Sequence, residues 1–214
     1  MKRVLIGCES SGVVREAFRR RGFDAWSCDL LPADDGSPHH FQMDLLELLA
    51  STMGQWHLLI AHPPCTHLAG SGARWLTDHW VKKKSAPGGR YWHDGGEKRA
   101  LQEASVAFVE TIWAAQVPRI AIENPVGMLS TLWMKPTQII QPFHFGDPFR
   151  KGTCLWLKNL PPLAKTNDLG NGEQKCWKEP PSPNRWKVRS KTYQGIADAM
   201  AEQWGSAVDS GRAN

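Results

Sequence analysis

Short apolar runs that alternate with helix-like segments constrain the fold of this chain more than any other feature. The runs at 4–6, 58–61 and 120–122 have the length of strands and are apolar at every position. Such runs are typical of parallel strands buried on both faces. Helices are expected between them at 12–21, 45–49 and 97–115, the last of them amphipathic. We therefore predict an α/β fold with an open, mostly parallel sheet flanked by helices.

The remaining pattern favours one domain. A chain of 214 residues can bury one substantial core but is short for two domains and a linker. After 138 the pattern changes to β-like pieces at 139–140 and 153–157, and a last helix is expected at 191–204. No run approaches the roughly 18 apolar residues of a membrane span, and no long signal-peptide core follows the first residues. We expect a soluble, cytoplasmic protein without a membrane partner.

Cysteine and histidine spacing indicates neither a disulfide framework nor a metal site. Five cysteines include no CxxC pair, and eight histidines show no HxH or HxxxH spacing. We therefore assign no metal.

Positive charge gathers in the last third of the chain. The net charge is +5, and the segment 150–191 holds ten Lys and Arg residues and three acidic ones, so the remainder is slightly acidic. Trp156, Trp177 and Trp186 are interleaved with these cations. The mixture is typical of a groove that follows phosphates and offers stacking faces. A solvated loop whose tryptophans pack on the core is the alternative.

A long stretch rich in Gly, Lys and Trp, 62–96, follows the apolar run at 58–61. Loops longer than about 15 residues in compact domains are usually functional or disordered. Ligands of open parallel sheets bind at the carboxyl ends of the strands. We therefore expect a lid over the substrate, with a mobile solvated loop as the alternative. Its cations are Arg74, Lys82, Lys83, Lys84 and Arg90.

The first strand-to-helix turn reads Gly7-Cys8-Glu9-Ser10-Ser11-Gly12. Its small residues let a ligand approach the backbone, although a tight turn also needs them for its own geometry. Asp29 ends the next strand, where a carboxylate can accept hydrogen bonds from both hydroxyls of a ribose. Asp44 can accept from an adenine amino group or simply cap the helix that follows it.

The clearest chemical signal is Ala61-His62-Pro63-Pro64-Cys65-Thr66, directly after a buried strand. Proline fixes the backbone there and presents the next side chain outward. A cysteine that opens a polar loop is poorly placed for burial, so we interpret Cys65 as a nucleophile rather than a structural residue. His62 and His67 flank it and could tune its pKa, although we expect both to be surface residues.

A second motif, Ile122-Glu123-Asn124-Pro125, also ends an apolar strand. Carbon 5 of cytosine becomes nucleophilic only after carbon 6 has been attacked. Its methylation therefore needs a thiolate for carbon 6 and an acid at ring nitrogen 3. Cys65 and Glu123 supply that pair on strands that a parallel sheet can place side by side. We expect burial to raise the pKa of Glu123 toward neutrality.

The ordered set of a Gly-rich turn, Pro-Cys, Glu-Asn-Pro, a basic segment at 145–153 and a terminal helix resembles the cytosine-5 DNA methyltransferases. The resemblance spans about 3–204 and implies a Rossmann-like S-adenosylmethionine-dependent methyltransferase fold acting on a flipped cytosine in DNA. The implied catalytic residues are Cys65, Glu123 and Arg150. The implied cofactor-binding residues are Gly7, Glu9, Ser10, Ser11, Gly12, Asp29, Leu30, Asp44 and Pro64. The implied substrate-binding residues are Pro63, Thr66, Asn124, Pro125, Lys151 and Thr153.

The chain also departs from the family pattern. Ser10-Ser11-Gly12 replaces Phe-x-Gly-x-Gly-Gly, and Thr66 stands where Gln usually follows the cysteine. The family's Gln-x-Arg-x-Arg motif is only partly present, with Arg150 or Lys151 in its region.

The resemblance also implies how the chain is divided. We expect one methyltransferase domain, 1–214, with a catalytic core at about 1–157 and 190–205 and a small basic target-recognition region at about 158–189. So short a region predicts short or relaxed sequence recognition. The compactness resembles phage or mobile-element enzymes, which act in a bacterial or phage-infected cell.

Three other functions remain open at this point. Exocyclic amino methyltransferases usually carry Asp/Asn-Pro-Pro-Tyr/Phe, and His62-Pro63-Pro64-Cys65 has neither the polar acceptor nor the aromatic residue of that signature. A nucleic-acid-binding protein that has kept the fold without catalysis is the second. The third is a methyltransferase that acts on RNA or a free nucleotide, or uses a modified methyl donor.

Overall fold

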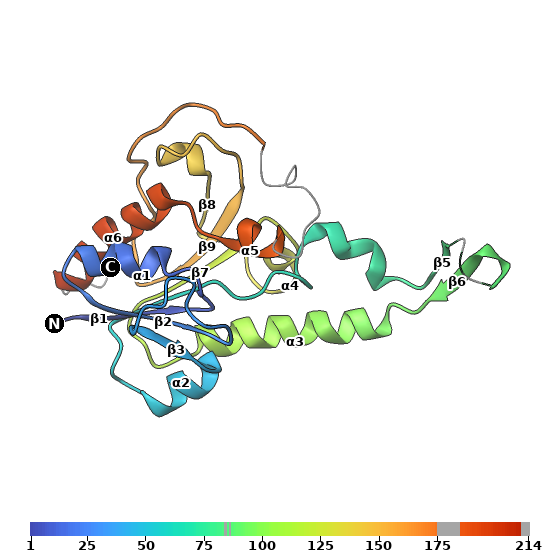
Figure 1. The fold of residues 1–214 in the computed structure, drawn as a ribbon, viewed down its shortest axis with the longest axis horizontal. Coiled ribbons are helices and arrows are strands. Elements are labelled where there is room, and N and C mark those ends of the chain that lie inside the picture. Colours follow the sequence, from blue (N-terminus) through green and yellow to red (C-terminus); the bar gives the residue numbers. More distant parts are fainter. Residues whose placement is uncertain (84, 86, 175–184, 211–214) are drawn as a thin grey trace.

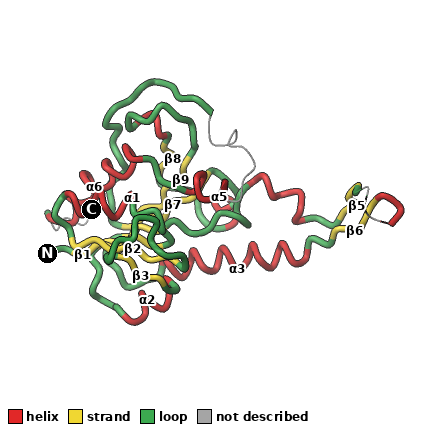
Figure 2. Tube along the Cα trace, in the orientation of Figure 1, coloured by secondary structure: helices red, strands yellow, loops and turns green. Residues whose placement is uncertain are grey.

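The computed structural model describes residues 1–83, 85, 87–174 and 185–210 (Figures 1 and 2). Its strands are β1 (Arg3–Gly7), β2 (Asp24–Asp29), β3 (His40–Gln42), β4 (Leu58–Ala61), β5 (His79–Lys82), β6 (Arg90–His93), β7 (Ile120–Pro125), β8 (Gln138–Ile140) and β9 (Thr153–Lys158). Its α-helices are α1 (Val13–Arg20), α2 (Leu45–Ser51), α3 (Gly96–Trp113), α4 (Leu129–Leu132), α5 (Arg185–Ser190) and α6 (Gln194–Asp209). Short 3-10 helices are η1 (Gly70–Leu76), η2 (Pro87–Gly89) and η3 (Pro142–His144).

Seven strands form the main sheet in the order β3-β2-β1-β4-β7-β9-β8. β3, β2, β1, β4 and β7 pair in parallel. β9 runs antiparallel to both of its neighbours, β7 and β8. The predicted open, mostly parallel α/β sheet of Rossmann-like type is therefore confirmed.

Helices cover both faces of this sheet, which explains why the central strands are apolar at every position. On one face, Val4, Ile6 and Ile60 pack against α1 and α6, whose Trp204 is fully buried. On the other face, Leu5 and Leu59 pack with residues of α2, α3 and α4. In Figure 1, α6 lies above the strands of the sheet, whereas α2 and α3 lie below them. Among the described residues, no helix combines the length and hydropathy needed to span a bilayer.

The segment predicted as one long loop, 62–96, contains regular structure instead. η1 is followed by an antiparallel two-stranded ribbon, β5 and β6, that is separate from the main sheet. Figure 1 shows this ribbon projecting from the body beyond the first residues of α3. α3 also differs from a fully packed amphipathic helix, because only Gln102, Val109 and Ile112 are buried along it. Its first turns therefore extend away from the core.

Candidate active site

The strand order contains a topological switch point between β1 and β4. From β1 the chain continues to β2 and β3 on one side, and from β4 it continues to β7 on the other. Connections that diverge in this way leave a crevice at the carboxyl ends of the two strands. The residues that follow β1 and β4 are the predicted Gly-rich turn and the Pro-Cys motif. A hydrogen bond from the His62 backbone N–H to the Gly7 carbonyl, 2.9 Å, joins them.

Cys65 begins a tight turn directly after β4. Its carbonyl accepts from the backbone N–H groups of Leu68 at 3.0 Å and Ala69 at 2.9 Å, so the backbone on its C-terminal side is fixed. The side chain of Pro63 is buried while Pro64 is exposed, and Cys65 is half-buried. Burial raises the pKa of the Cys65 thiol and the charge of Glu123 raises it further, whereas Lys151 lowers it. The thiol therefore needs help to ionise.

Glu123 lies in β7, on the strand next to β4, with its side chain 12% exposed. Burial alone raises the pKa of this carboxyl group. A hydrogen bond from His62, the charge of Lys151 and a hydrogen bond from Thr153 oppose that effect and bring the pKa below its ordinary value. The expected shift toward neutrality is therefore wrong for this structure, because the prediction considered burial without the surrounding donors.

His62 lies inside the candidate site and not at the surface, where the sequence analysis placed it. Its side chain is 10% exposed rather than at the surface, and its Nδ1 lies 3.4 Å from Oε2 of Glu123. Its Nε2 is buried and has no hydrogen-bond partner among the described residues. His62 also acts electrostatically on the buried Glu9. Its place at the end of a fully buried strand was the signal that could have identified it.

Asn124 connects the two motifs. Its buried amide Nδ2 donates to the Pro63 carbonyl at 2.8 Å, which ties the end of β7 to the loop that carries Cys65. Pro125 pairs in register with Thr153 of β9, whose hydroxyl oxygen lies 3.1 Å from the Lys151 carbonyl. Asn124 was predicted to bind substrate; one of its amide N–H donors holds the Pro63 carbonyl, and the contact with substrate stays a prediction.

Of the two cations that the motif comparison named, Arg150 and Lys151, only Lys151 acts on the candidate catalytic pair. Arg150 is exposed, and its guanidinium donates to the side chain of Asn171, with the Nε bond at 2.9 Å. Lys151 instead lowers the pKa of both Cys65 and Glu123. Arg189 of α5 also lowers the pKa of Cys65. These two cations, rather than Arg150, are placed to act on the candidate catalytic pair.

The predicted cofactor residues lie at the carboxyl ends of β1 and β2. Gly12 adopts a φ of 70°, and a Cβ at this position would come within 2.2 Å of the Arg15 side chain. Glu9 is buried and accepts from the N–H groups of Val14 at 2.8 Å and Arg15 at 3.3 Å, so its carboxylate caps α1. Ser10 and Ser11 complete the half-buried turn. Glu9 thus shapes the turn from within.

Two acidic residues and an exposed leucine lie beside that turn. Asp29 accepts from the Leu31 N–H through Oδ1 at 2.9 Å, and Leu30 is 70% exposed. Asp44 caps α2, with both backbone donors directed to its Oδ1. Asp29 and Asp44 both raise the pKa of the neighbouring Cys8, because burial and nearby negative charge disfavour its thiolate. The two carboxylates therefore lie close to the same strand end.

Thr66 and the two residues after it are hydrogen-bonded to the body of the protein. The Thr66 carbonyl accepts from Lys98 Nζ at 3.2 Å, and the His67 carbonyl accepts from Gln102 Nε2 at 3.1 Å. The Met128 N–H donates to the Leu68 carbonyl at 2.8 Å. Of the cations predicted for a lid, Lys84 lies outside the described residues, and Lys82 and Arg90 belong to the projecting ribbon.

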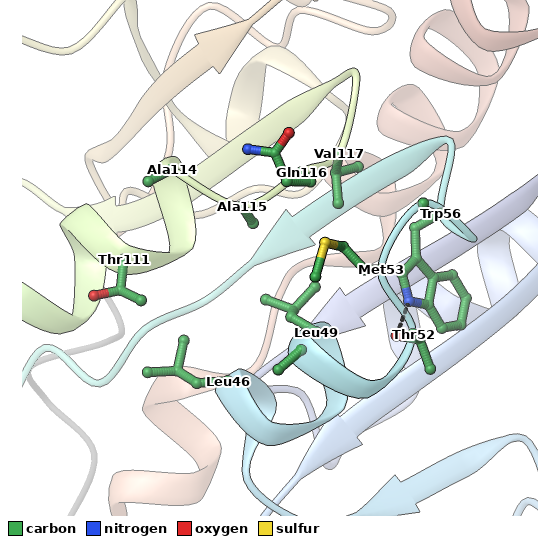
Figure 3. Close-up of a pocket in the computed structure, with 12 residues that line it drawn as sticks. Leu46, Leu49, Thr52, Met53, Trp56, Thr111, Ala114, Ala115, Gln116 and Val117 are labelled. Carbon is green, nitrogen blue, oxygen red and sulfur yellow. Dashed lines mark hydrogen bonds between the residues drawn. The ribbon is translucent and has the colours of Figure 1, made fainter.

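A hollow lined mainly by apolar side chains lies at the opposite end of the sheet (Figure 3). It is bounded by α2, the segment after it and the last turn of α3, including Leu49, Met53, Trp56 and Val117. Trp56 Nε1 donates to the Thr52 hydroxyl at its edge, 2.7 Å away. No thiol, carboxylate or histidine is among its lining residues, so the candidate chemistry belongs at the carboxyl ends of the strands.

Comparisons with known proteins leave the family open. No protein-family model matches the chain, and no curated protein matches it. Among solved structures, the chain is similar to that of a triple mutant of Spodoptera frugiperda DNMT2, with 12% sequence identity and a TM-score of 0.36. The match covers 82% of this chain and 55% of that chain, so this chain spans about half the length of that protein. The functional argument accordingly rests on the site itself.

Proposed function

We propose that this protein is an S-adenosylmethionine-dependent methyltransferase that modifies carbon 5 of cytosine in DNA. The observation that carries the proposal is the pairing of Cys65 with Glu123 at neighbouring strand ends, where the charge of Glu123 acts directly on the thiol. The 2.8 Å bond from Asn124 to Pro63 holds the two motifs together. A half-buried thiol near a largely buried carboxyl group matches the needs of addition to carbon 6 and assistance at nitrogen 3.

A single proton transfer within the pair can produce both catalytic groups, the thiolate and the acid. In the resting site Glu123 is ionised and opposes ionisation of Cys65. Transfer of the thiol proton to the carboxylate removes that opposition and produces a thiolate together with a neutral acid. Lys151 and Arg189 then stabilise the thiolate. The acid hydrogen-bonds to nitrogen 3 of the cytosine while the thiolate attacks carbon 6.

The remaining steps conserve atoms and electrons. Attack forms the bond between sulfur and carbon 6 and moves the ring electrons toward carbon 5. S-adenosylmethionine, when bound, would supply the methyl group: the bond between its sulfonium sulfur and the methyl carbon would break as carbon 5 forms the new carbon–carbon bond, and S-adenosylhomocysteine would leave. Loss of the carbon 5 proton to solvent water restores the double bond to carbon 6 and expels the Cys65 thiolate. Glu123 returns the ring to its neutral form by exchanging the proton at nitrogen 3.

The residues at the ends of β1 and β2 fit an adenosine-containing donor. Asp29 and Asp44 each accept backbone N–H groups through Oδ1. We assign their Oδ2 atoms to the ribose hydroxyls and the adenine amino group of the donor. Leu30 offers an exposed apolar surface beside Asp29 for a flat base. The turn Gly7–Gly12 and Pro64 lie between this end and Cys65. These residues bind and orient the donor.

DNA is the proposed partner because cations surround the reacting pair. Besides Lys151, α5 brings Arg189 toward Cys65, and Lys187 of the same helix pairs with Asp34 after β2 at 2.6 Å. The described part of the basic segment therefore crosses the crevice. The proposed target-recognition region, about 158–189, includes 175–184, which lie outside the described residues. A target base must leave the duplex to reach this buried pair.

The test is transfer of a labelled methyl group from S-adenosylmethionine to mixed-sequence DNA, followed by digestion to nucleosides. We expect label in 5-methylcytosine that is lost in Cys65→Ala and strongly reduced in Glu123→Gln. Cys28→Ser is the matched control, because Cys28 is buried in β2 and its thiol donates to the Met43 carbonyl, away from Cys65. DNA containing 5-fluorocytosine should trap a Cys65 adduct, because fluorine cannot leave as the proton does.

Other products would identify the alternatives. Label on an exocyclic nitrogen would replace the proposal with amino methylation. Label in RNA or a free nucleotide, but not in DNA, would change the substrate. Donor and DNA binding without any transfer would indicate a nucleic-acid-binding protein that has kept the fold.

A further inference from the structure

The β5–β6 ribbon carries an unusual surface on one of its two faces. In its antiparallel register Trp80 pairs with Trp92 and Lys82 pairs with Arg90. Residues two apart on a strand point to the same side, so these four side chains share one face. All four are exposed, with Trp80 at 56% and Trp92 at 52%. We call Trp80, Lys82, Arg90 and Trp92 the ribbon face.

The opposite face of the ribbon is occupied by contacts within the protein. His79 and His93 both pack against Trp75 of η1, with ring centroids 5.4 and 4.9 Å away. His93 Nε2 also bonds to the Trp75 carbonyl at 2.9 Å. At the base, the Gly95 N–H donates to Asp78 Oδ1 at 2.9 Å. The ribbon is therefore anchored through one face, which leaves the ribbon face turned to solvent.

Aromatic and cationic groups on the ribbon face are arranged together. The Arg90 guanidinium lies over the Trp80 ring, 4.7 Å from its centroid, and the Trp80 and Trp92 rings meet edge to face at 5.4 Å. Exposing two indoles is unfavourable in water, because such large apolar surfaces gain free energy from burial. A guanidinium lying over an indole offers phosphates a charge, and the exposed indoles offer bases a flat surface.

The ribbon projects from the same side of the sheet as the candidate active site. Lys98, in the first turns of α3, contacts the Thr66 carbonyl next to Cys65, and β6 precedes that helix directly. From Lys98 back to Arg90 the helical and extended residues span about 20 Å. In duplex DNA this length corresponds to about six base pairs. The ribbon face is thus too distant to hold the target base and is placed to meet its flanks.

We propose that the ribbon face binds the DNA flanking the target cytosine, as a second contact outside the active site. The inference rests on the proposed function for its choice of DNA, and on exposure and charge for its location. A two-stranded ribbon fits the major groove, and cations beside tryptophans suit phosphates and bases. A second copy of the chain is a poorer occupant, because two such faces would bring their four cations together.

Binding of fluorescein-labelled mixed-sequence duplexes, measured by anisotropy without a methyl donor, tests this inference. Duplexes of about 24 base pairs can reach both contacts, whereas those of about 6 cannot. We expect Trp80→Ala/Trp92→Ala to weaken binding of the long duplex by roughly 10-fold or more and to abolish the preference for length. The control Met53→Ala/Ile139→Ala removes two equally exposed apolar side chains and should leave both affinities unchanged.

The outcomes separate this inference from the proposed function. Loss of the preference for long duplexes in the double tryptophan variant supports DNA binding by the ribbon face, even when no methyl transfer is detected. Cys65→Ala should retain the preference for long duplexes. Unchanged duplex binding in the double tryptophan variant would overturn the inference that the ribbon face binds DNA, but it would not contradict the proposed methyl transfer. Self-association that the double tryptophan variant abolishes, with duplex binding unaltered, would make the face a protein interface. Absence of duplex binding by the unaltered protein would also overturn it.

Discussion

At the scale of single residues, His62 controls the protonation of Glu123. His62→Ala removes the leading interaction that lowers the pKa of Glu123 and leaves burial, which raises it. The carboxylate then protonates at a higher pH. Because the proposed reaction starts from the carboxylate, the acid limb of the kcat/KM profile should move to higher pH. Ionised Glu123 contributes stability that is present above the ordinary pKa and is lost as the pH falls through the lowered pKa of the folded state. His62→Ala should make this contribution smaller, because it raises the folded-state pKa.

Two variants separate this effect from general damage near Cys65. His62→Gln keeps an N–H donor and should restore part of the original profile. His67→Ala removes the other flanking histidine, whose Nδ1 contacts Lys98 at 2.7 Å rather than Glu123, and should leave the acid limb in place. An acid limb that stays fixed in His62→Ala would contradict the assigned role.

Asn124 should matter for both stability and rate. Asn124→Ala leaves the Pro63 carbonyl without its 2.8 Å donor in a buried position, which costs about 1–3 kcal/mol in the free energy of unfolding. Loosening of the Cys65 loop should also lower kcat. Asn159→Gly is the matched control, because Asn159 donates to the Pro118 carbonyl at 2.8 Å and already has a positive φ. Urea unfolding would measure the loss of stability, and single-turnover kinetics would measure the loss of rate. Equal rate losses in the two variants would contradict the positioning role of Asn124.

At the scale of elements, two tryptophans distinguish the body from the ribbon. Trp204 of α6 is fully buried, and its Nε1 donates to the Pro161 carbonyl at 2.9 Å. Trp204→Ala should therefore lower the free energy of unfolding by about 3–5 kcal/mol. Trp80→Ala should change it by less than about 0.5 kcal/mol, because the side chain is mainly solvent-exposed. Denaturant titration would show whether the ribbon instead packs on the body, in which case the two losses would be similar.

The sequence predicted the elements of the sheet better than the elements outside it. Leu58–Ala61 and Ile120–Ile122 are apolar at every position because both faces are covered, and that pattern is visible without a structure. β5 and β6 carry no such pattern, since His79, Trp80 and their partners alternate without a buried apolar face. The contact of His62 with Glu123 joins residues 61 positions apart, so local pattern could not reveal the direction of the pKa shift.

At the scale of the whole molecule, the placement of charge should matter more than its total. Lys82→Ala/Arg90→Ala and Arg20→Ala/Arg21→Ala each remove two positive charges from a chain of net charge +5. The first pair lies on the ribbon face. Arg20 and Arg21 lie at the C-terminal end of α1, away from the active site, and form ion pairs with Asp198 and Glu202 of α6. If Lys82 and Arg90 each contact one phosphate, their loss should reduce the slope of log K against log salt by about 1.8. The α1 variant should retain the original slope. Equal slopes in the two variants would mean that DNA affinity depends on the net charge of the protein alone and that the ribbon face makes no phosphate contact.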